Sequence, residues 1–350
     1  MLIQFLIFFL TTAHAAPSTP LADQPFVARP FGFLIPSFSP VPSLASSGED
    51  GFDLEAHLGA EARLDLGTGG QMGALVELDL TPSPGLKDAY ALYRPTSFLR
   101  VDLGQFKIPY GLGFQASDTR RLLPMAPVAT EGLVGRDEGI MVTGSLPIHG
   151  VSVGSLQLAA FNGEGPNIYQ DPDHRYLFVV RGLITPFGAR VKPFEGSDGT
   201  LYLGLGGGLL DNTVEAGGAA HVRQYGADVQ FAWNVLSVQG ELLLGSRALE
   251  DGAPERSIGG YGTLSVFLPF PWVKDHVQLI GRFGQSDPQV QSSEGGDATR
   301  EFTGGLDLYW FAAPGPFSDV KLQLAFSHVD DLDDVTTSSD QLVVAATVRF

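Results

Sequence analysis

Lysine and arginine residues at particular positions of this chain are candidates for binding anions. Arg63 and Arg100 stand at alternating polar positions of two extended segments, and Lys107 ends the second segment. Cations on the inner face of a narrow passage attract and select anions. Each could instead pair with a nearby carboxylate, and the sequence leaves both interpretations open. The candidates for such a constriction are Arg63, Arg100, Lys107, Arg120, Arg121 and Arg136, and Arg181 and Arg282 are further candidates for its wall.

Catalytic chemistry finds little support in the sequence. The chain has no cysteine, which removes thiol catalysis, cysteine metal sites and disulfides. Its seven histidines are scattered, and no two of them have the four-residue spacing of a helical zinc site. A lipase-like Ser–His pair on the outside of a barrel is the weakest of the alternatives. We therefore expect no enzyme activity, no metal site and no cofactor.

The charge balance limits the partners. Lysine and arginine number 21 against 39 aspartate and glutamate, which gives a formal net charge of −18. This balance argues against nucleic acid, whose phosphates bind lysine and arginine. It also opposes strong selection of phosphate, because acidic side chains on an inner face repel it. The acidic positions predicted to face inward are Asp53, Glu55, Glu61, Asp65, Glu77, Asp79, Asp102, Glu241 and Asp307.

The elements that position these charges are β-strands. In Phe52–Leu66, apolar residues and charged or small residues alternate without a break over fifteen positions. Period two is the spacing of a strand, whereas a helix would mix the two kinds of residue on each face. Such a strand has one apolar face and one polar face.

Sixteen segments of this kind recur along the chain. The links between them alternate between short turns and longer polar loops, and the longest loop is 108–137. We predict an all-β fold, a transmembrane antiparallel barrel of about 16 strands, a size that encloses an aqueous channel. The predicted strands are Phe31–Phe38, Phe52–Leu66, Met72–Leu80, Asp88–Tyr93, Phe98–Lys107, Glu138–Leu146, Val151–Phe161, Arg175–Thr185, Thr200–Leu210, Val222–Trp233, Leu236–Arg247, Ser257–Leu268, Val277–Gln285, Phe302–Phe311, Val320–Val329 and Gln341–Phe350.

The two ends of the chain fit an exported barrel. Residues 1–15 form an apolar run ending in small residues, which predicts a secretory signal, with a flexible leader at 16–27 and the barrel at 28–350. The last strand, Gln341–Phe350, is apolar at every second position and ends on an aromatic residue. We expect it to close the barrel against Phe31–Phe38, a weak first strand interrupted by Pro36. Val344, Ala346 and Val348 would then face lipid.

Several motifs in the first half of the chain resemble the phosphate-selective porin O and P family. They are LKDAYALYRP (Leu86–Pro95), FLRVDLGQFKIPYG (Phe98–Gly111), GRDEGIMVTGSL (Gly135–Leu146), AAFNGEG (Ala159–Gly165) and VVRGLITPFG (Val179–Gly188). The resemblance implies a 16-stranded bacterial outer-membrane porin, a homotrimer, that passes small anions by diffusion. It also implies that the loop 108–137, the third extracellular loop, folds inward and narrows the barrel.

The acidic composition departs from that family, so phosphate selection is the weakest part of the resemblance. The alternative from a different class is a structural or adhesive outer-membrane barrel without an open pore. We expect outer-membrane lipid and lipopolysaccharide around the barrel and small ions or solutes inside it.

Overall fold

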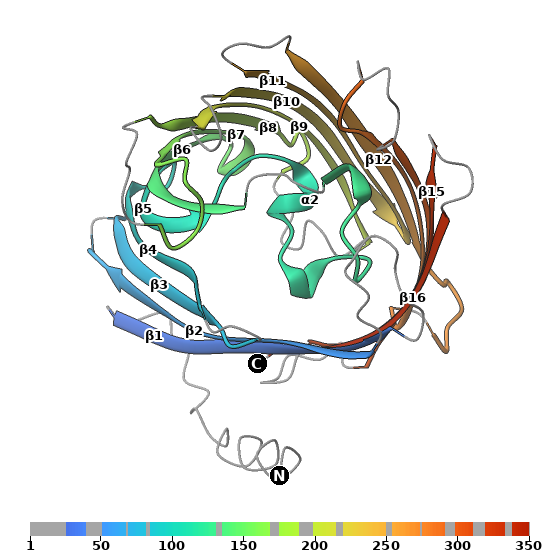
Figure 1. The fold of residues 1–350 in the computed structure, drawn as a ribbon. Helices are drawn as coiled ribbons and strands as arrows, with labels where there is room; N and C mark the ends of the chain where they lie inside the picture. The colour runs from blue at the N-terminus through green and yellow to red at the C-terminus, as the bar shows by residue number, and fades with distance from the viewer. Residues whose placement is uncertain are drawn as a thin grey trace.

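Sixteen antiparallel strands close into a barrel in the computed structural model of the protein, counted over the residues that the structure describes (Figure 1). Each strand pairs with its neighbours in the chain, and the last pairs with the first. This confirms the predicted fold class. The described residues are 26–39, 51–67, 69–81, 85–130, 135–168, 175–188, 199–214, 220–249, 254–273, 275–290, 298–310, 319–332 and 338–349.

The strands are longer than predicted at several ends, because ladder pairing continues into residues whose alternation is poor. They are β1 (Phe26–Ser39), β2 (Gly51–Asp65), β3 (Gln71–Asp79), β4 (Gly85–Thr96), β5 (Leu99–Lys107), β6 (Arg136–Ile148), β7 (Val151–Phe161), β8 (Leu177–Ile184), β9 (Gly199–Val214), β10 (Ala220–Asn234), β11 (Leu236–Leu249), β12 (Glu255–Phe267), β13 (Val277–Asp287), β14 (Thr299–Tyr309), β15 (Asp319–Asp331) and β16 (Ser338–Arg349). β1 begins two residues before the expected barrel start at 28, and the predicted signal and most of the leader lie outside the described residues.

The seam between β1 and β16 closes the ring as predicted. Phe33 lies opposite Arg349 and Phe38 opposite Val344, in one continuous register. Ile35 and Pro36 take no part in this register, although Pro36 still lies opposite Leu54 of β2. Proline has no N–H to donate, so one side of its strand loses a ladder bond. The predicted interruption at Pro36 is therefore confined to the seam with β16.

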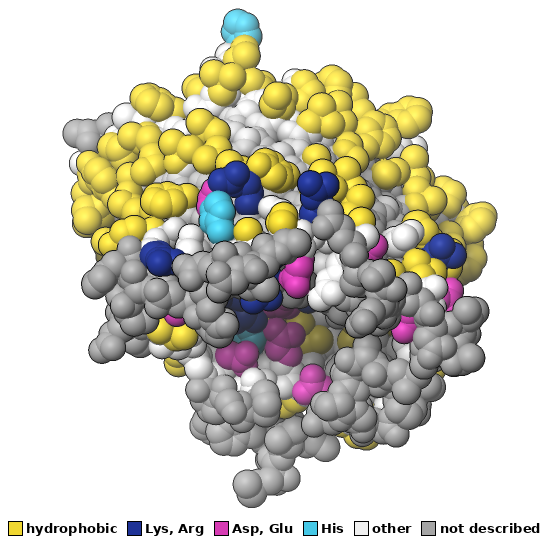
Figure 2. All heavy atoms as spheres, turned by 45° about the horizontal axis from the view of Figure 1, so that its top comes forward, with side chains coloured by type: hydrophobic (Ala, Val, Ile, Leu, Met, Phe, Trp, Pro, Cys, Tyr) yellow, Lys and Arg dark blue, Asp and Glu magenta, His cyan; other side chains and the backbone are white. Residues whose placement is uncertain are grey.

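The two faces of the wall differ in polarity. In β13, Gln278, Ile280 and Arg282 are buried, whereas Leu279 and Phe283 on the other face are 48% and 47% exposed. Figure 2 shows hydrophobic side chains gathered on the outer surface, and acidic and basic side chains within the hollow. An apolar outer belt around a polar interior suits a barrel surrounded by hydrocarbon. No helix in the described part of the chain is long and apolar enough to cross a membrane.

A long connection between β5 and β6 lies inside the ring of strands (Figure 1). This segment, residues 108–135, is called the inner loop, and the structure describes it except at 131–134. It contains the short helix α2 (Leu112–Gln115) and the single 3₁₀ turns η2 (Asp118–Arg120) and η3 (Val128–Thr130). The prediction that Arg136 belongs to this loop is wrong, because Arg136 pairs with Lys107 as the first residue of β6.

Candidate functional site: the opening beside the inner loop

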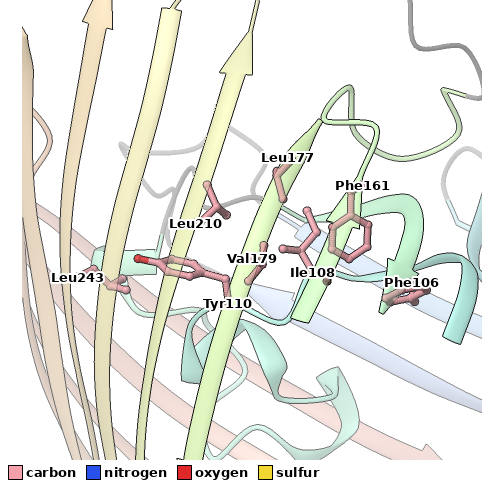
Figure 3. Packing of buried hydrophobic residues seen from close by; sticks show 9 residues of the cluster. Phe106, Ile108, Tyr110, Phe161, Leu177, Val179, Leu210 and Leu243 are labelled. Atoms are coloured by element: carbon pink, nitrogen blue, oxygen red, sulfur yellow. The ribbon is translucent and has the colours of Figure 1, made fainter. Parts of the chain in front are cut away.

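The inner loop leaves the wall through an apolar contact. Ile108 and Tyr110 are almost fully buried, and they pack with Phe161, Val179 and Leu243 from the wall (Figure 3). Tyr110 lies against the inner face of β9, where a Cβ on residue 208 would be in ordinary van der Waals contact with the ring, at 3.5 Å. This contact fixes where the loop begins to cross the interior.

Backbone groups of α2 are then held by a carboxylate on the opposite wall. The amide nitrogens of Leu112 and Gly113 donate to the two Glu241 oxygens of β11, at 2.6 and 3.0 Å. Free N–H groups at a helix start need acceptors, and a carboxylate is a strong one. Glu241 was expected to contribute negative charge to the interior, and its oxygens also accept hydrogen bonds from the loop backbone.

The second half of the loop is held by a buried ion pair. Arg282 and Glu301 pair with each other, and their side chains are only 4% and 1% exposed. Arg282 also donates to the carbonyl oxygens of Met125 and Ala126, at 2.8 and 3.0 Å. Glu301 accepts the amide of Val128, at 3.1 Å. A buried pair is tolerated only when its remaining donors and acceptors are satisfied, and here the loop backbone satisfies them.

Two strands further along, polar side chains and close packing complete the attachment. Lys321 Nζ donates to the Arg121 carbonyl oxygen at 2.7 Å, and Gln323 donates to the Leu122 carbonyl oxygen at 3.2 Å. Leu123 packs so closely on β14 that a Cβ at Gly305 would lie 2.5 Å from it. The loop is therefore attached to the inner face of β11 and of β13–β15.

The unfilled space lies on the other side of the loop. A cavity of about 850 Å³, called the opening, separates the loop from the wall formed by β1, β3–β6 and β16. Apolar and aromatic side chains line part of it: Phe31, Phe33, Leu75 and Tyr90. Four cations and three carboxylates also line it, namely Lys107, Arg120, Arg136 and Arg349, and Glu77, Asp88 and Asp118. The lining therefore carries one formal positive charge more than negative, in a chain of net charge −18.

An ionic contact between Lys87 and Asp118 joins the loop to the wall of the opening. Lys87 of β4 donates to Asp118 of the loop at 2.9 Å, and Arg121 contacts the other oxygen of Asp118 at 2.8 Å. Burial alone would raise the pKa of the Asp118 carboxyl. The cations Arg121, Lys107 and Lys87 outweigh burial and hold that pKa below its ordinary range. Asp118 thus stays ionised between its partners at neutral pH.

Three of the six candidate cations come together at the opening: Lys107, Arg120 and Arg136. Arg136 is paired with Asp88 at 2.9 Å, while Lys107 Nζ donates to the carbonyl oxygens of Phe114 and Ala116. The other three lie elsewhere. Arg100 pairs with Asp102 of its own strand, Arg63 pairs with Glu61 and is 62% exposed, and Arg121 lies beside a smaller cavity between the loop and β11–β13.

Sequence reasoning missed several residues of this region. Lys87, Glu301 and Lys321 were not selected, and Arg282 was considered only as a wall residue. Their partners are remote in the chain: the bond from Val128 to Glu301 spans 173 residues. Alternation could have indicated that Glu301 and Lys321 face inward, but it holds no signal for the loop backbone they contact.

Comparison with known proteins gives the fold a class. No protein-family model and no curated protein sequence matches the chain. Among solved structures, an OmpT loop-deletion mutant from Vibrio cholerae has a TM-score of 0.64 at 8% identity, covering 93% of this chain and 100% of the other. The anion-selective porin of Comamonas acidovorans has a TM-score of 0.63 at 12% identity, covering 93% and 100%. Salmonella typhi OmpF in complex with daunomycin has 0.63 at 12%, covering 92% and 97%.

The fold is that of the outer-membrane porins. The agreement extends over almost the whole of each chain. The resemblance to the phosphate-selective family has no counterpart in a matching family model.

Proposed function

We propose that this protein is an outer-membrane porin through which small hydrophilic solutes and ions diffuse passively. The opening beside the inner loop carries the proposal, because a barrel with a filled interior would leave no path past the loop. The apolar outer face supports a place in the outer membrane, surrounded by lipid and lipopolysaccharide. No catalytic step is needed for this function, and we propose none.

The lining charge supports weak selection in favour of anions. Lys107, Arg120, Arg136 and Arg349 stand at the opening, and carboxylates there offset most of their charge. Phosphate, the solute implied by the family resemblance, would need a more strongly basic path than this one. We therefore propose a general anion-tolerant pore, with phosphate as one of several solutes.

Single-channel recording in a planar bilayer tests the proposal. We expect discrete conductance steps in KCl, and a reversal potential that indicates a modest preference for chloride. Arg120→Gln with Arg121→Gln should shift that potential toward cation preference, and Arg63→Gln is the matched control away from the opening. Absence of conductance would favour the alternative, a structural or adhesive barrel without an open pore. A strong anion preference that survives loss of both arginines would contradict the role of the loop cations.

A homotrimer is proposed for the assembled protein. One solved structure with this fold, at a TM-score of 0.60, is a trimer form of OmpT of Vibrio cholerae. Light scattering on the detergent-solubilised protein should give three chains per particle. A mass of one chain, in a sample that still conducts, would reject the trimer and leave the pore.

A further inference from the structure

The opening has two kinds of lining that a path for small hydrated ions does not need together. Phe31, Phe33 and Tyr90 bring three aromatic rings to it, and Lys107 and Arg120 bring cations. Phe31 and Phe33 are on β1 and Tyr90 is on β4, while Arg120 is on the inner loop. A concave site lined by apolar rings and a few charged groups has the usual make-up of a small-molecule binding site.

Lys107 and Arg136 differ in the charge of the groups that they contact. Lys107 Nζ donates to two carbonyl oxygens, of Phe114 and Ala116, at 3.1 and 2.6 Å. Carbonyl oxygens carry no net charge, and an ammonium has a third N–H to donate. The positive charge of Lys107 is therefore not cancelled by these bonds. Arg136, in contrast, is already paired with Asp88.

The rings can receive another ring. The Lys87 ammonium lies 5.8 Å from the centre of the Phe33 ring, and the Arg100 guanidinium lies 6.0 Å from that of Tyr90. Phe33 is buried and lies 4.2 Å from the His57 ring, and Tyr90 meets the Phe106 ring edge-on at 5.7 Å. The half-buried rings of Phe31 and Tyr90 are therefore the ones that a further ring would meet. The volume of about 850 Å³ falls within the size of small-molecule sites.

We propose that the opening binds and passes small organic anions that join a flat apolar ring to a carboxylate. The carboxylate lies at Lys107 and Arg120, and the ring lies against Phe31 and Tyr90. This inference rests on the proposed function and narrows it, because inorganic phosphate has no group to place on the rings.

Two measurements test the inference, with benzoate, cyclohexanecarboxylate, acetate and inorganic phosphate as probes. The first is block of the KCl current through single channels. The second is isothermal titration calorimetry on the detergent-solubilised barrel, which detects binding whether or not the barrel conducts. We expect benzoate to bind about 2- to 10-fold more tightly than acetate or phosphate, the range of one favourable aromatic contact. Cyclohexanecarboxylate should lie between them.

Two variants separate the ring from the charge. Phe31→Leu should reduce the ratio of benzoate to acetate affinity toward one, and Arg120→Gln should weaken both anions alike. Phe326→Leu, on the outward face, and Arg63→Gln are the matched controls. Circular dichroism establishes that each variant is folded before it is compared.

The outcomes distinguish this inference from the proposed function. If the barrel conducts but binds benzoate and acetate with equal affinity, or prefers phosphate, the inference is overturned. The proposed porin function then still stands. Benzoate binding in calorimetry without any conductance supports the site and overturns the porin. If the protein shows neither conductance nor benzoate binding, the porin function and the anion site are both rejected.

Discussion

The two sides of the barrel wall meet the inner loop in different ways. On the side of β11 and β13–β15, buried charged and polar side chains bind backbone atoms of the loop, as Arg282 binds the carbonyl oxygens of Met125 and Ala126. On the side of β1–β6, Lys87 pairs with Asp118 and Lys107 donates to the carbonyl oxygens of Phe114 and Ala116, and the opening lies beside these contacts. Bonds to the backbone fix the path of the loop whatever its side chains are. The side chains at the opening are then left to decide what passes.

The largest effect is expected from breaking the attached side. Arg282→Met removes one partner of a buried pair and leaves Glu301 without its counter-charge, at a cost of about 3–5 kcal/mol in unfolding free energy. The loop should also detach, so single-channel conductance should rise and become noisy. Urea unfolding in detergent measures the first effect. Arg63→Met, at an exposed pair, should change stability by about 0.5 kcal/mol or less. A stable Arg282→Met variant of unchanged conductance would show that the pair does not hold the loop.

A smaller effect is expected at the start of the loop. Glu241→Ala removes the acceptor of two amide groups in α2, which should cost about 1–3 kcal/mol. Glu241→Gln keeps one oxygen acceptor and should restore part of the loss. Unfolding curves of the two variants measure this difference. If alanine and glutamine prove equal, the hydrogen bonds to α2 contribute nothing to stability.

A smaller effect again is expected on the open side. Asp118→Asn weakens the contact with Lys87 and Arg121, which is partly exposed, so stability should fall by about 1 kcal/mol or less. Conductance should respond more than stability, because the loop loses its ionic contact with Lys87 of β4. Recording of current substates at neutral pH measures the change. A drop in stability as large as that of Arg282→Met would erase the contrast between the two sides.

The smallest effect is a dependence on pH. The folded-state pKa of Asp118 is lowered, so its stabilising contribution is complete above the ordinary carboxyl pKa of about 3.9 and is lost as pH falls through the lowered value. From pH 7 to 5 the substate pattern should therefore stay constant on account of this group. New substates should appear only in stronger acid, and Asp118→Asn should show them at every pH. Onset near pH 6 in the unmodified protein would assign the effect to another group.

Much of the fold was predictable because strand alternation is a local property. In Phe52–Leu66 the alternation of apolar and polar residues predicts which face is apolar. Applying the same alternation criterion along the chain gives the number of strands. The ends were less predictable: β1 begins at Phe26 and passes through Pro30 and Pro36, because one neighbouring strand supplies enough pairing to carry it. The sequence predicted that Arg120 lies in the long loop and Lys107 at its mouth. It did not predict that both line the same opening.

The composition by itself does not show which inward carboxylates are paired. Asp102 pairs with Arg100 of its own strand, and Asp307 of β14 lies 3.7 Å from Lys321 of β15. The second pair depends on the register between strands, which a count of acidic residues does not contain.

The sequence alone determined a barrel of sixteen strands, with an apolar face outward and a polar face inward, since period two assigns each side chain to a face. The tertiary structure decided which inward residues meet. The contact of Leu112 with Glu241 spans 129 residues, and that of Arg282 with Met125 spans 157. Such contacts exist only once the ring has closed and the inner loop has been held against one side, so the shape and charge of the opening are properties of the closed barrel.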